Sequence, residues 1–278
     1  MTMINFNLLP MRNFSIFFLS LLFFLAFPLT FSAQTLSADN DGDGCVGTPD
    51  LLTLLSQFGE CSSSFTCGDL ISHDGYDYST VQIGEQCWFS ENCRYLPSVS
   101  PSEFNSGSET VPYYYVYDYE GTDVAAAQAT SNYETYGVLY NWPAVMAEGI
   151  CPSGWHIPSD GEWQTMEISL GMTEAEAASE GPRGSPVGNY LKSSTGWDST
   201  KTWSGNGSDS VGFTGLPAGF ASTGGFTYTE IIAVWWSATE VDSGQESYWK
   251  RILWDSSDAV VREGNWGGDG FSARCVRD

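Results

Sequence analysis

The sequence is poor in basic residues. Its 278 residues include 10 Lys and Arg and 2 His against 34 Asp and Glu, which gives a net charge of −24. Such an acidic surface repels nucleic acid and anionic lipid and attracts cations, so we expect no nucleic-acid partner. Solubility in salty surroundings explains the same acidity without any ligand. Aromatic residues make up 15% of the chain, which argues against a disordered protein despite the charge.

Motifs of common catalytic sites are also missing. No G-x-S-x-G turn occurs, no two cysteines are spaced C-x-x-C, and the two histidines, His73 and His156, lie far apart in the sequence. These absences disfavour a serine hydrolase and a zinc site, and we interpret His156 as a hydrogen-bonded structural residue. We therefore expect a protein that is not an enzyme. A hydrolase with an unrecognised carboxylate pair is the alternative, because so many acidic residues produce pairs by chance.

Residues 1–33 have the pattern of a signal peptide. Arg12 precedes an apolar stretch over residues 14–27, and Phe31-Ser-Ala33 supplies the small residues of a cleavage site. A retained membrane anchor is the alternative, because residues 14–31 approach spanning length. The leader predicts a secreted or cell-surface protein with no membrane insertion after cleavage, and the oligomeric state stays open.

Residues 34–61 resemble a small calcium-binding module. Carboxylates stand at positions 1, 3, 5 and 12 of one loop, a glycine stands at position 6, and position 7 supplies a backbone carbonyl. This spacing lets several oxygens converge on calcium around a sharp turn. The predicted ligands are Asp39, Asp41, Asp43, Cys45 and Asp50.

The aspartate at position 12 makes this loop similar to dockerin loops. A dockerin carries two such loops and one is visible here, which weakens any prediction of a cohesin-like partner. An acidic linker is the alternative interpretation. A leucine-rich helix is predicted after the loop, and residues 62–66 are predicted to be a linker.

The most informative stretch of the remaining chain is Cys151-Pro-Ser-Gly-Trp-His-Ile-Pro-Ser-Asp-Gly-Glu-Trp163. Ser159 and Glu162 have the spacing of a capping box, so a helix is predicted to begin there. Trp163, Met166 and Leu170 then recur at helical spacing as one apolar stripe, and Gly171 predicts the end of the helix.

Five further blocks accompany this stretch in a fixed order. They are Val81-Gln-Ile-Gly-Glu-Gln-Cys-Trp-Phe-Ser-Glu-Asn92, Tyr136-Gly-Val-Leu-Tyr-Asn-Trp142, Leu216-Pro-Ala-Gly-Phe220, Trp235-Trp-Ser-Ala-Thr-Glu240 and Phe271-Ser-Ala-Arg-Cys-Val-Arg-Asp278. Together the blocks resemble the Fibrobacter succinogenes major paralogous domain family. The resemblance implies a secreted α+β domain over residues 67–278 with a C-type-lectin-like fold, in which antiparallel strands accompany about two helices and a long loop region. It implies no reaction.

Seven cysteines in an exported chain favour disulfides, with one thiol left over. The resemblance implies a bridge between Cys151 and Cys275, because both lie in family blocks. Cys67 and Cys87 would close a loop over the first strand. A bridge between Cys45 and Cys61 is less well supported, and Cys93 is expected to be the unpaired cysteine.

Alternating residues predict strands at 76–83, 86–89, 111–117 and 136–142, and closing strands at 231–237, 247–254, 259–262 and 271–276. Between them, residues 181–230 are rich in Gly, Ser and Thr and are predicted to form mostly loops. In lectin-like folds a long loop region of this kind carries the ligand contacts.

Lectin-like folds that bind sugar through calcium carry Glu-Pro-Asn or Gln-Pro-Asp and a later Trp-Asn-Asp, and this sequence has neither. The candidate ligand-binding residues are instead Trp197, Trp203, Asn265, Trp266 and Asp269. We expect a binding module for an extracellular glycan or protein. A structural or adhesive component without a small ligand is the alternative.

Overall fold

The computed structural model describes residues 45–56, 65–105, 108, 110–198, 205–241 and 247–278. The chain divides into one unit over residues 1–63 and a second over residues 64–278. Within the described ranges, no helix has the length and apolar character needed to cross a membrane. The predicted signal peptide and three of the predicted calcium ligands, Asp39, Asp41 and Asp43, lie outside these ranges.

The described part of the first unit is the helix α1 (Thr48–Ser56) and the turn before it. Asp50 is buried, and its Oδ2 accepts the backbone N–H of Gly47 at 2.8 Å. Leu51 and Leu52 are more than half exposed. The helix predicted after the acidic loop is therefore present.

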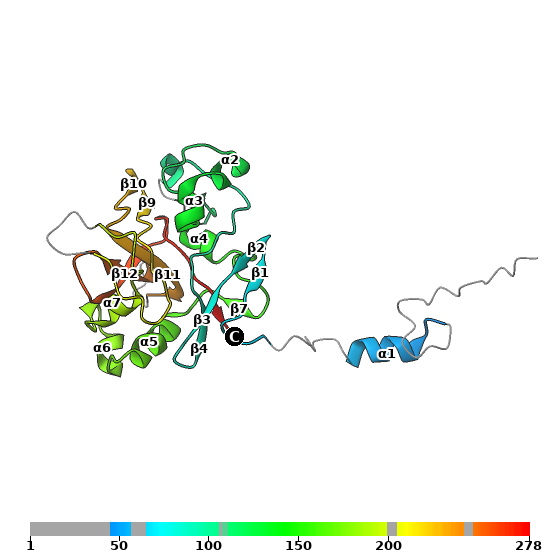
Figure 1. Cartoon of the computed structure of the whole chain (residues 1–278). Coiled ribbons are helices and arrows are strands. Elements are labelled where there is room, and N and C mark those ends of the chain that lie inside the picture. Colours follow the sequence, from blue (N-terminus) through cyan, green and yellow to red (C-terminus); the bar gives the residue numbers. More distant parts are fainter. Residues whose placement is uncertain (1–44, 57–64, 106–107, 109, 199–204, 242–246) are drawn as a thin grey trace, which may run out of the picture. The chain divides into compact units, whose positions relative to one another are not determined.

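The second unit has a mixed α/β architecture built on antiparallel sheets and short helices (Figure 1). One four-stranded sheet has the order β3-β4-β14-β7, and another has the order β11-β12-β13-β8. The strands of the first are β3 (Thr80–Ile83), β4 (Gln86–Phe89), β14 (Val276–Arg277) and β7 (Trp155–His156). Those of the second are β11 (Ile232–Glu240), β12 (Ser247–Trp254), β13 (Val260–Trp266) and β8 (Gly181–Arg183).

Three two-stranded ladders complete the described sheets: β1 (Ile71–His73) with β2 (Tyr76–Tyr78), β5 (Tyr114–Tyr115) with β6 (Leu139–Tyr140), and β9 (Phe220–Ser222) with β10 (Gly225–Thr227). The helices are η1 (Ser102–Asn105), α2 (Val124–Gln128), α3 (Ser131–Tyr136), α4 (Trp142–Val145), α5 (Asp160–Ser169), α6 (Glu174–Ala178) and α7 (Val187–Leu191). Figure 1 shows α5, α6 and α7 grouped on one side of this unit and α2, α3 and α4 on another.

Several predicted strands are shorter than expected. The strand predicted over 76–83 is split at Ser79, because β2 pairs with β1 whereas β3 pairs with β4. Of the strand predicted over 111–117, only β5 is present. Of the strand predicted over 271–276, only the last residue lies in a strand, β14. Individual backbone hydrogen bonds hold residues 271–276 instead of a continuous ladder. The N–H of Cys93 donates to the carbonyl of Ala273, and the N–H of Phe89 donates to the carbonyl of Cys275.

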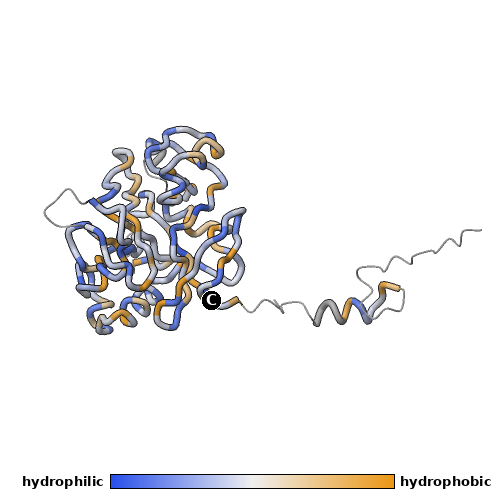
Figure 2. The backbone as a smooth tube through the Cα atoms, viewed as in Figure 1, coloured by the Kyte–Doolittle hydropathy of each residue, from blue (hydrophilic) through white to orange (hydrophobic). Residues whose placement is uncertain are grey.

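The helix predicted after Ser159 is α5, and its capping box is present. The Ser159 side chain accepts the N–H of Glu162, and the Glu162 carboxylate accepts the N–H of Ser159. Trp163 and Met166 are 1% exposed and form part of one hydrophobic cluster with residues of β4 and β11. Hydrophobic stretches are short and interspersed with hydrophilic ones throughout this unit (Figure 2), as expected for elements with one buried face.

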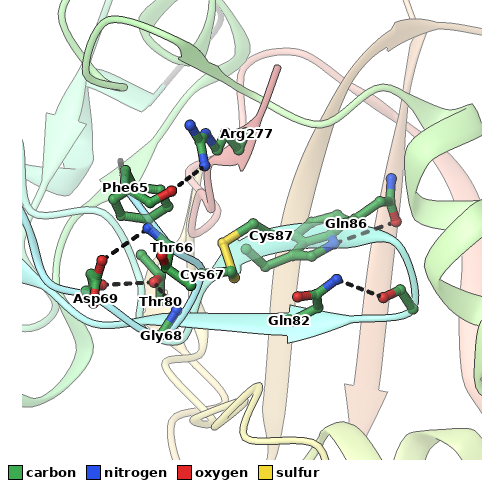
Figure 3. Close-up of a disulfide and its surroundings, with 12 residues drawn as sticks. Phe65, Thr66, Cys67, Gly68, Asp69, Thr80, Gln82, Gln86, Cys87 and Arg277 are labelled. Carbon is green, nitrogen blue, oxygen red and sulfur yellow. Dashed lines mark hydrogen bonds between the residues drawn. A yellow bond between two sulfur atoms is a disulfide. The ribbon is translucent and has the colours of Figure 1, made fainter. Parts of the chain in front are cut away.

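Two disulfides fix the ends of the second unit to its centre. Cys151 is bonded to Cys275, which ties the segment before β7 to the segment before β14. Cys67 is bonded to Cys87 on β4, and Thr80 Oγ1 beside it donates to the carbonyl of Asp69 (Figure 3). Both pairs were predicted. Cys45 is exposed and Cys61 lies outside the described residues, so the third pair stays a prediction.

Cys93 is a buried free cysteine, as predicted, and its Sγ lies 3.5 Å from Cys275 Sγ. Burial raises the pKa of the Cys93 thiol to about 12, and the nearby positive charge of Arg274 offsets only part of this effect. The thiol is therefore protonated at neutral pH.

A buried ionic network joins α5 to the second sheet. Asp160 accepts hydrogen bonds from Arg251 Nη1 at 2.8 Å and from Arg262 Nε and Nη2 at 2.9 and 2.8 Å. Glu167, about two turns further along the same face of α5, accepts from Arg251 Nε at 2.7 Å and from Arg183 Nη2 at 2.6 Å. Each of these five side chains is 8% exposed or less. The network fastens α5 to β12, β13 and β8.

We predict that Asp160→Asn lowers the free energy of unfolding by about 3–5 kcal/mol, because it leaves buried Arg262 without a carboxylate partner and Arg251 with Glu167 alone. Denaturant unfolding at pH 7 measures this loss. The matched control is Asp258→Asn, whose half-exposed carboxylate lies 3.5 Å from Lys192 Nζ. Because Lys192 is buried but keeps its hydrogen bonds to the carbonyls of Trp254 and Ser257, we expect this substitution to cost less than Asp160→Asn.

The stabilisation should also depend on pH. Burial alone raises the pKa of Asp160, but Arg262 and Arg251 outweigh burial and hold that pKa below its usual value. Because the folded pKa is depressed, the contribution is present above the unfolded pKa of about 4 and is lost as pH falls through the folded pKa. Equal stabilities of Asp160→Asn and the parent chain at pH 7 would contradict the prediction.

Candidate functional site

A pocket of about 210 Å³ lies on the face of the second sheet that is opposite to α5. We call it the aromatic pocket. Its floor consists of side chains of β11, β12 and β13, and one wall comes from Phe220 of β9 and Tyr228, which follows β10. Phe271 and Asp269 contribute the remaining side.

Strand alternation places the floor residues. Lys250, Ile252 and Trp254 are spaced by two on β12 and face the pocket, whereas Arg251 between them points to α5. The register sets Trp254 opposite Ile232 of β11 and Lys250 opposite Glu263 of β13. A basic, an apolar and an aromatic residue therefore follow one another along the floor.

The aromatic side of the pocket has three rings. The rings of Phe220 and Tyr228 are stacked with centroids 5.7 Å apart, and Tyr228 meets Trp254 edge to face at 6.3 Å. Tyr228 is 48% exposed, which makes it one of the most exposed large hydrophobic residues of this unit. An exposed ring supported by two partners is an accessible surface for stacking.

The backbone holds Tyr228 in an unfavourable conformation. Its φ is 61°, in the left-handed region that bulky residues rarely adopt. The Tyr228 carbonyl accepts the N–H of Ile231 at 3.2 Å and of Ile232 at 3.0 Å, which locks this turn onto the start of β11. Gly219 lies underneath, and a Cβ there would come within 2.4 Å of the Thr227 carbonyl. Such strain is typical of residues positioned for function.

The polar side of the pocket is a chain of hydrogen bonds. Lys250 Nζ donates to Asn265 Oδ1 at 3.0 Å and lies 3.1 Å from Glu263 Oε1. Asn265 Nδ2 donates to Asp269 Oδ2 at 2.9 Å and to the Trp266 carbonyl at 2.7 Å. Both N–H groups of Asn265 are thus used, and its orientation is fixed.

Asp269 is the titratable group of interest here. Burial raises its pKa, and the hydrogen bond from Asn265 and the charge of Lys250 lower it only in part. The hydrogen bond from Asn265 reaches Oδ2, and no donor to Oδ1 is found among the described residues. The pocket therefore offers an acceptor oxygen beside an ammonium group.

The structure brings together two of the five predicted ligand-binding residues, Asn265 and Asp269. Trp266 ends β13 and its ring lies against Gly268, outside the pocket lining. Trp197 does not line the pocket: it is 3% exposed, and its Nε1 donates to Ser193 Oγ and the Gly215 carbonyl, both at 3.1 Å. Trp203 lies outside the described residues.

Sequence reasoning missed Lys250, Trp254, Tyr228 and Phe220. Lys250 is one of only 10 basic residues, and it stands at strand spacing from Trp254, which was a usable signal. Nothing in the local sequence indicates that Tyr228 adopts a positive φ or that the turn carrying it reaches Trp254.

A larger cavity of about 490 Å³ lies beside α5, but its main polar groups are bonded to each other. His156 Nε2 lies 2.7 Å from Glu162 Oε1, and Nδ1 lies 2.5 Å from Asp278 Oδ1. Burial lowers the pKa of His156, but these two carboxylates outweigh burial and raise it. His156 is thus hydrogen-bonded, as predicted, and we place the candidate site at the aromatic pocket instead.

No group of three or more His, Cys, Asp or Glu side chains is arranged to hold a metal ion in the part of the chain that the structure describes. Of the predicted calcium ligands, that part includes only Cys45, which is exposed, and Asp50, which is buried. Calcium binding stays a prediction.

Comparison with known proteins gives one match. The model of the Fibrobacter succinogenes major domain family matches residues 81–277, which is more than half of the chain. No curated protein and no solved structure matches.

We predict that Lys250→Met raises the pKa of Asp269 further, because it removes the one positive charge that favours the carboxylate. Titration of the side-chain carboxyl by NMR measures this pKa. Lys250→Arg keeps the charge and should leave the pKa near its value in the parent chain. An Asp269 pKa that is the same in Lys250→Met as in the parent chain would show that the two groups are not coupled.

Proposed function

The chain belongs to the Fibrobacter succinogenes major domain family, and on that premise we propose that it is an extracellular, non-enzymatic carbohydrate-binding protein. The ligand occupies the aromatic pocket. The C-type-lectin-like fold that the sequence resembles and the predicted signal peptide belong to the same proposal.

One observation carries the proposal: aromatic rings, one of them exposed, and a fixed polar chain line the same small pocket. Tyr228 and Trp254 offer ring surfaces, and Lys250 and Asp269 offer a donor and an acceptor. Ligand sites combine an apolar wall with a few placed polar groups that fix orientation. The apolar face of a sugar ring can stack on the aromatic wall, and its hydroxyls can bond to the polar groups.

The two disulfides support an extracellular setting, because disulfides persist in oxidising compartments and are rare in the cytosol. The net charge of −24 further favours a neutral ligand over a polyanion.

The single acidic loop over residues 39–50 is proposed as a calcium-binding accessory to this domain. Three aspartates at alternating positions and Gly44 provide the oxygen ligands and the turn that calcium needs. The ion would order the loop ahead of α1.

Loss of the aromatic wall should weaken sugar binding. We predict that Tyr228→Ala and Trp254→Ala each cost on the order of 1–2 kcal/mol, or roughly tenfold in Kd, because each removes a stacking surface. A glycan array identifies the ligand, and isothermal titration calorimetry compares the variants.

Leu70→Ala is the matched control, because Leu70 is 61% exposed and is not among the residues that line the pocket. Its Kd should equal that of the parent chain. Folded protein that binds nothing on the array, or variants that bind as tightly as the parent, would refute the proposal.

Calcium binding is tested on the full mature chain. We predict a saturable calorimetric signal with a Kd of roughly 0.1–1 mM, as in other extracellular modules, and its loss in Asp41→Ala. Asp118→Ala, which removes a carboxylate from the second unit, should leave the signal unchanged. A flat titration of the parent chain would eliminate the calcium proposal.

A further inference from the structure

The polar side of the aromatic pocket specifies a class of sugar and a mode of recognition. Building on the proposed function, we infer that the pocket binds a single neutral pyranose ring through two adjacent hydroxyls, with the Lys250 ammonium group in place of a metal ion.

The volume limits the ligand to one ring. At about 210 Å³ the pocket is smaller than the roughly 300–1,000 Å³ of sites that enclose drug-sized ligands. The stacked pair Phe220 and Tyr228 forms one wall, and Trp254 on the floor packs edge to face against Tyr228. Further sugar units of a longer glycan would therefore extend out of the pocket.

The unused hydrogen-bonding capacity matches a pair of hydroxyls. An ammonium group has three donors, and Lys250 directs two of them to Asn265 and Glu263. The third donor and the Oδ1 acceptor of Asp269 are left for a ligand, as are the remaining lone pairs of Glu263. A hydroxyl can accept from the ammonium group and donate to a carboxylate at the same time, and a neighbouring hydroxyl can do the same with the second carboxylate.

The charges favour a neutral ring over an acidic one. Lys250 supplies one positive charge, and Glu263 and Asp269 together supply two negative charges. The carboxylate of a uronic acid would add a third negative charge to this half-buried place, and like charges at such distances repel strongly where the dielectric is low.

Lys250 also excludes a divalent cation from the same position. Its Nζ lies 3.0 Å from Asn265 Oδ1, 3.1 Å from Glu263 Oε1 and 5.0 Å from the centroid of the Phe271 ring. A metal ion would have to take these two oxygens from the ammonium group and lie beside its positive charge. The built-in cation thus orders the polar groups without calcium.

The test compares methyl glucoside, methyl mannoside and methyl galactoside with methyl glucuronide by ligand-observed NMR and calorimetry. It uses the full mature chain carrying Asp41→Ala, so that the N-terminal loop contributes no calcium dependence. We expect at least one neutral sugar to bind with the same Kd in calcium and in EDTA, and at least tenfold more tightly than methyl glucuronide.

Asp269→Asn separates charge from shape. It keeps the size of the side chain and removes one negative charge, so we expect the preference for the neutral sugar over the glucuronide to shrink. Lys250→Met should weaken binding of the neutral sugar, whereas Leu70→Ala should not. Thermal unfolding establishes that each variant is folded before its Kd is compared.

The outcomes distinguish this inference from the proposed function. Tighter binding of methyl glucuronide, or binding that EDTA abolishes, would overturn the inference and leave carbohydrate binding intact. A protein that binds multi-unit glycans on the array but none of the single sugars would also overturn it. Absence of binding to every sugar in both assays would overturn the inference and the proposed function together.

Discussion

The buried ionic network beneath α5 is the constraint on which the second sheet depends. Arg251 of β12 and Arg262 of β13 reach the same carboxylate, Asp160, so two strands and a helix are held by one side chain. Removing one member of such a network leaves a buried charge without a partner, which is strongly destabilising. We therefore expect the ion pairs of the network to form or break together. With one face of the sheet fixed in this way, the opposite face keeps a constant spacing of side chains.

The position of β12 matters because this strand contributes side chains to both faces of the second sheet. Lys250 and Arg251 are adjacent cations that point to opposite sides, one to the aromatic pocket and the other to α5. A shift of one residue in the register would exchange them. The ion pairs that stabilise the fold therefore also set the position of the ammonium group in the pocket.

Features encoded by a few neighbouring residues could be predicted from the sequence. The capping box at Ser159 and the pair Asn265 and Asp269 are of this kind, since their partners lie within four residues. Lys250, Trp254 and Tyr228 meet only through cross-strand register and a positive φ, which no local pattern reveals. The burial of Trp197 could not be predicted, because a loop-rich sequence does not show that its indole N–H finds two buried acceptors.

The thiol of Cys93 has a consequence for how the chain keeps its disulfides correctly paired. Cys275 is bonded to Cys151, and the free thiol of Cys93 lies 3.5 Å from the Cys275 sulfur, so a third sulfur is within contact distance of this disulfide. Burial raises the pKa of the Cys93 thiol far above neutral pH, so the thiolate, which is the species that attacks a disulfide, is scarce there. Once the core closes around Cys93, the correct pairing is preserved by the slowness of exchange.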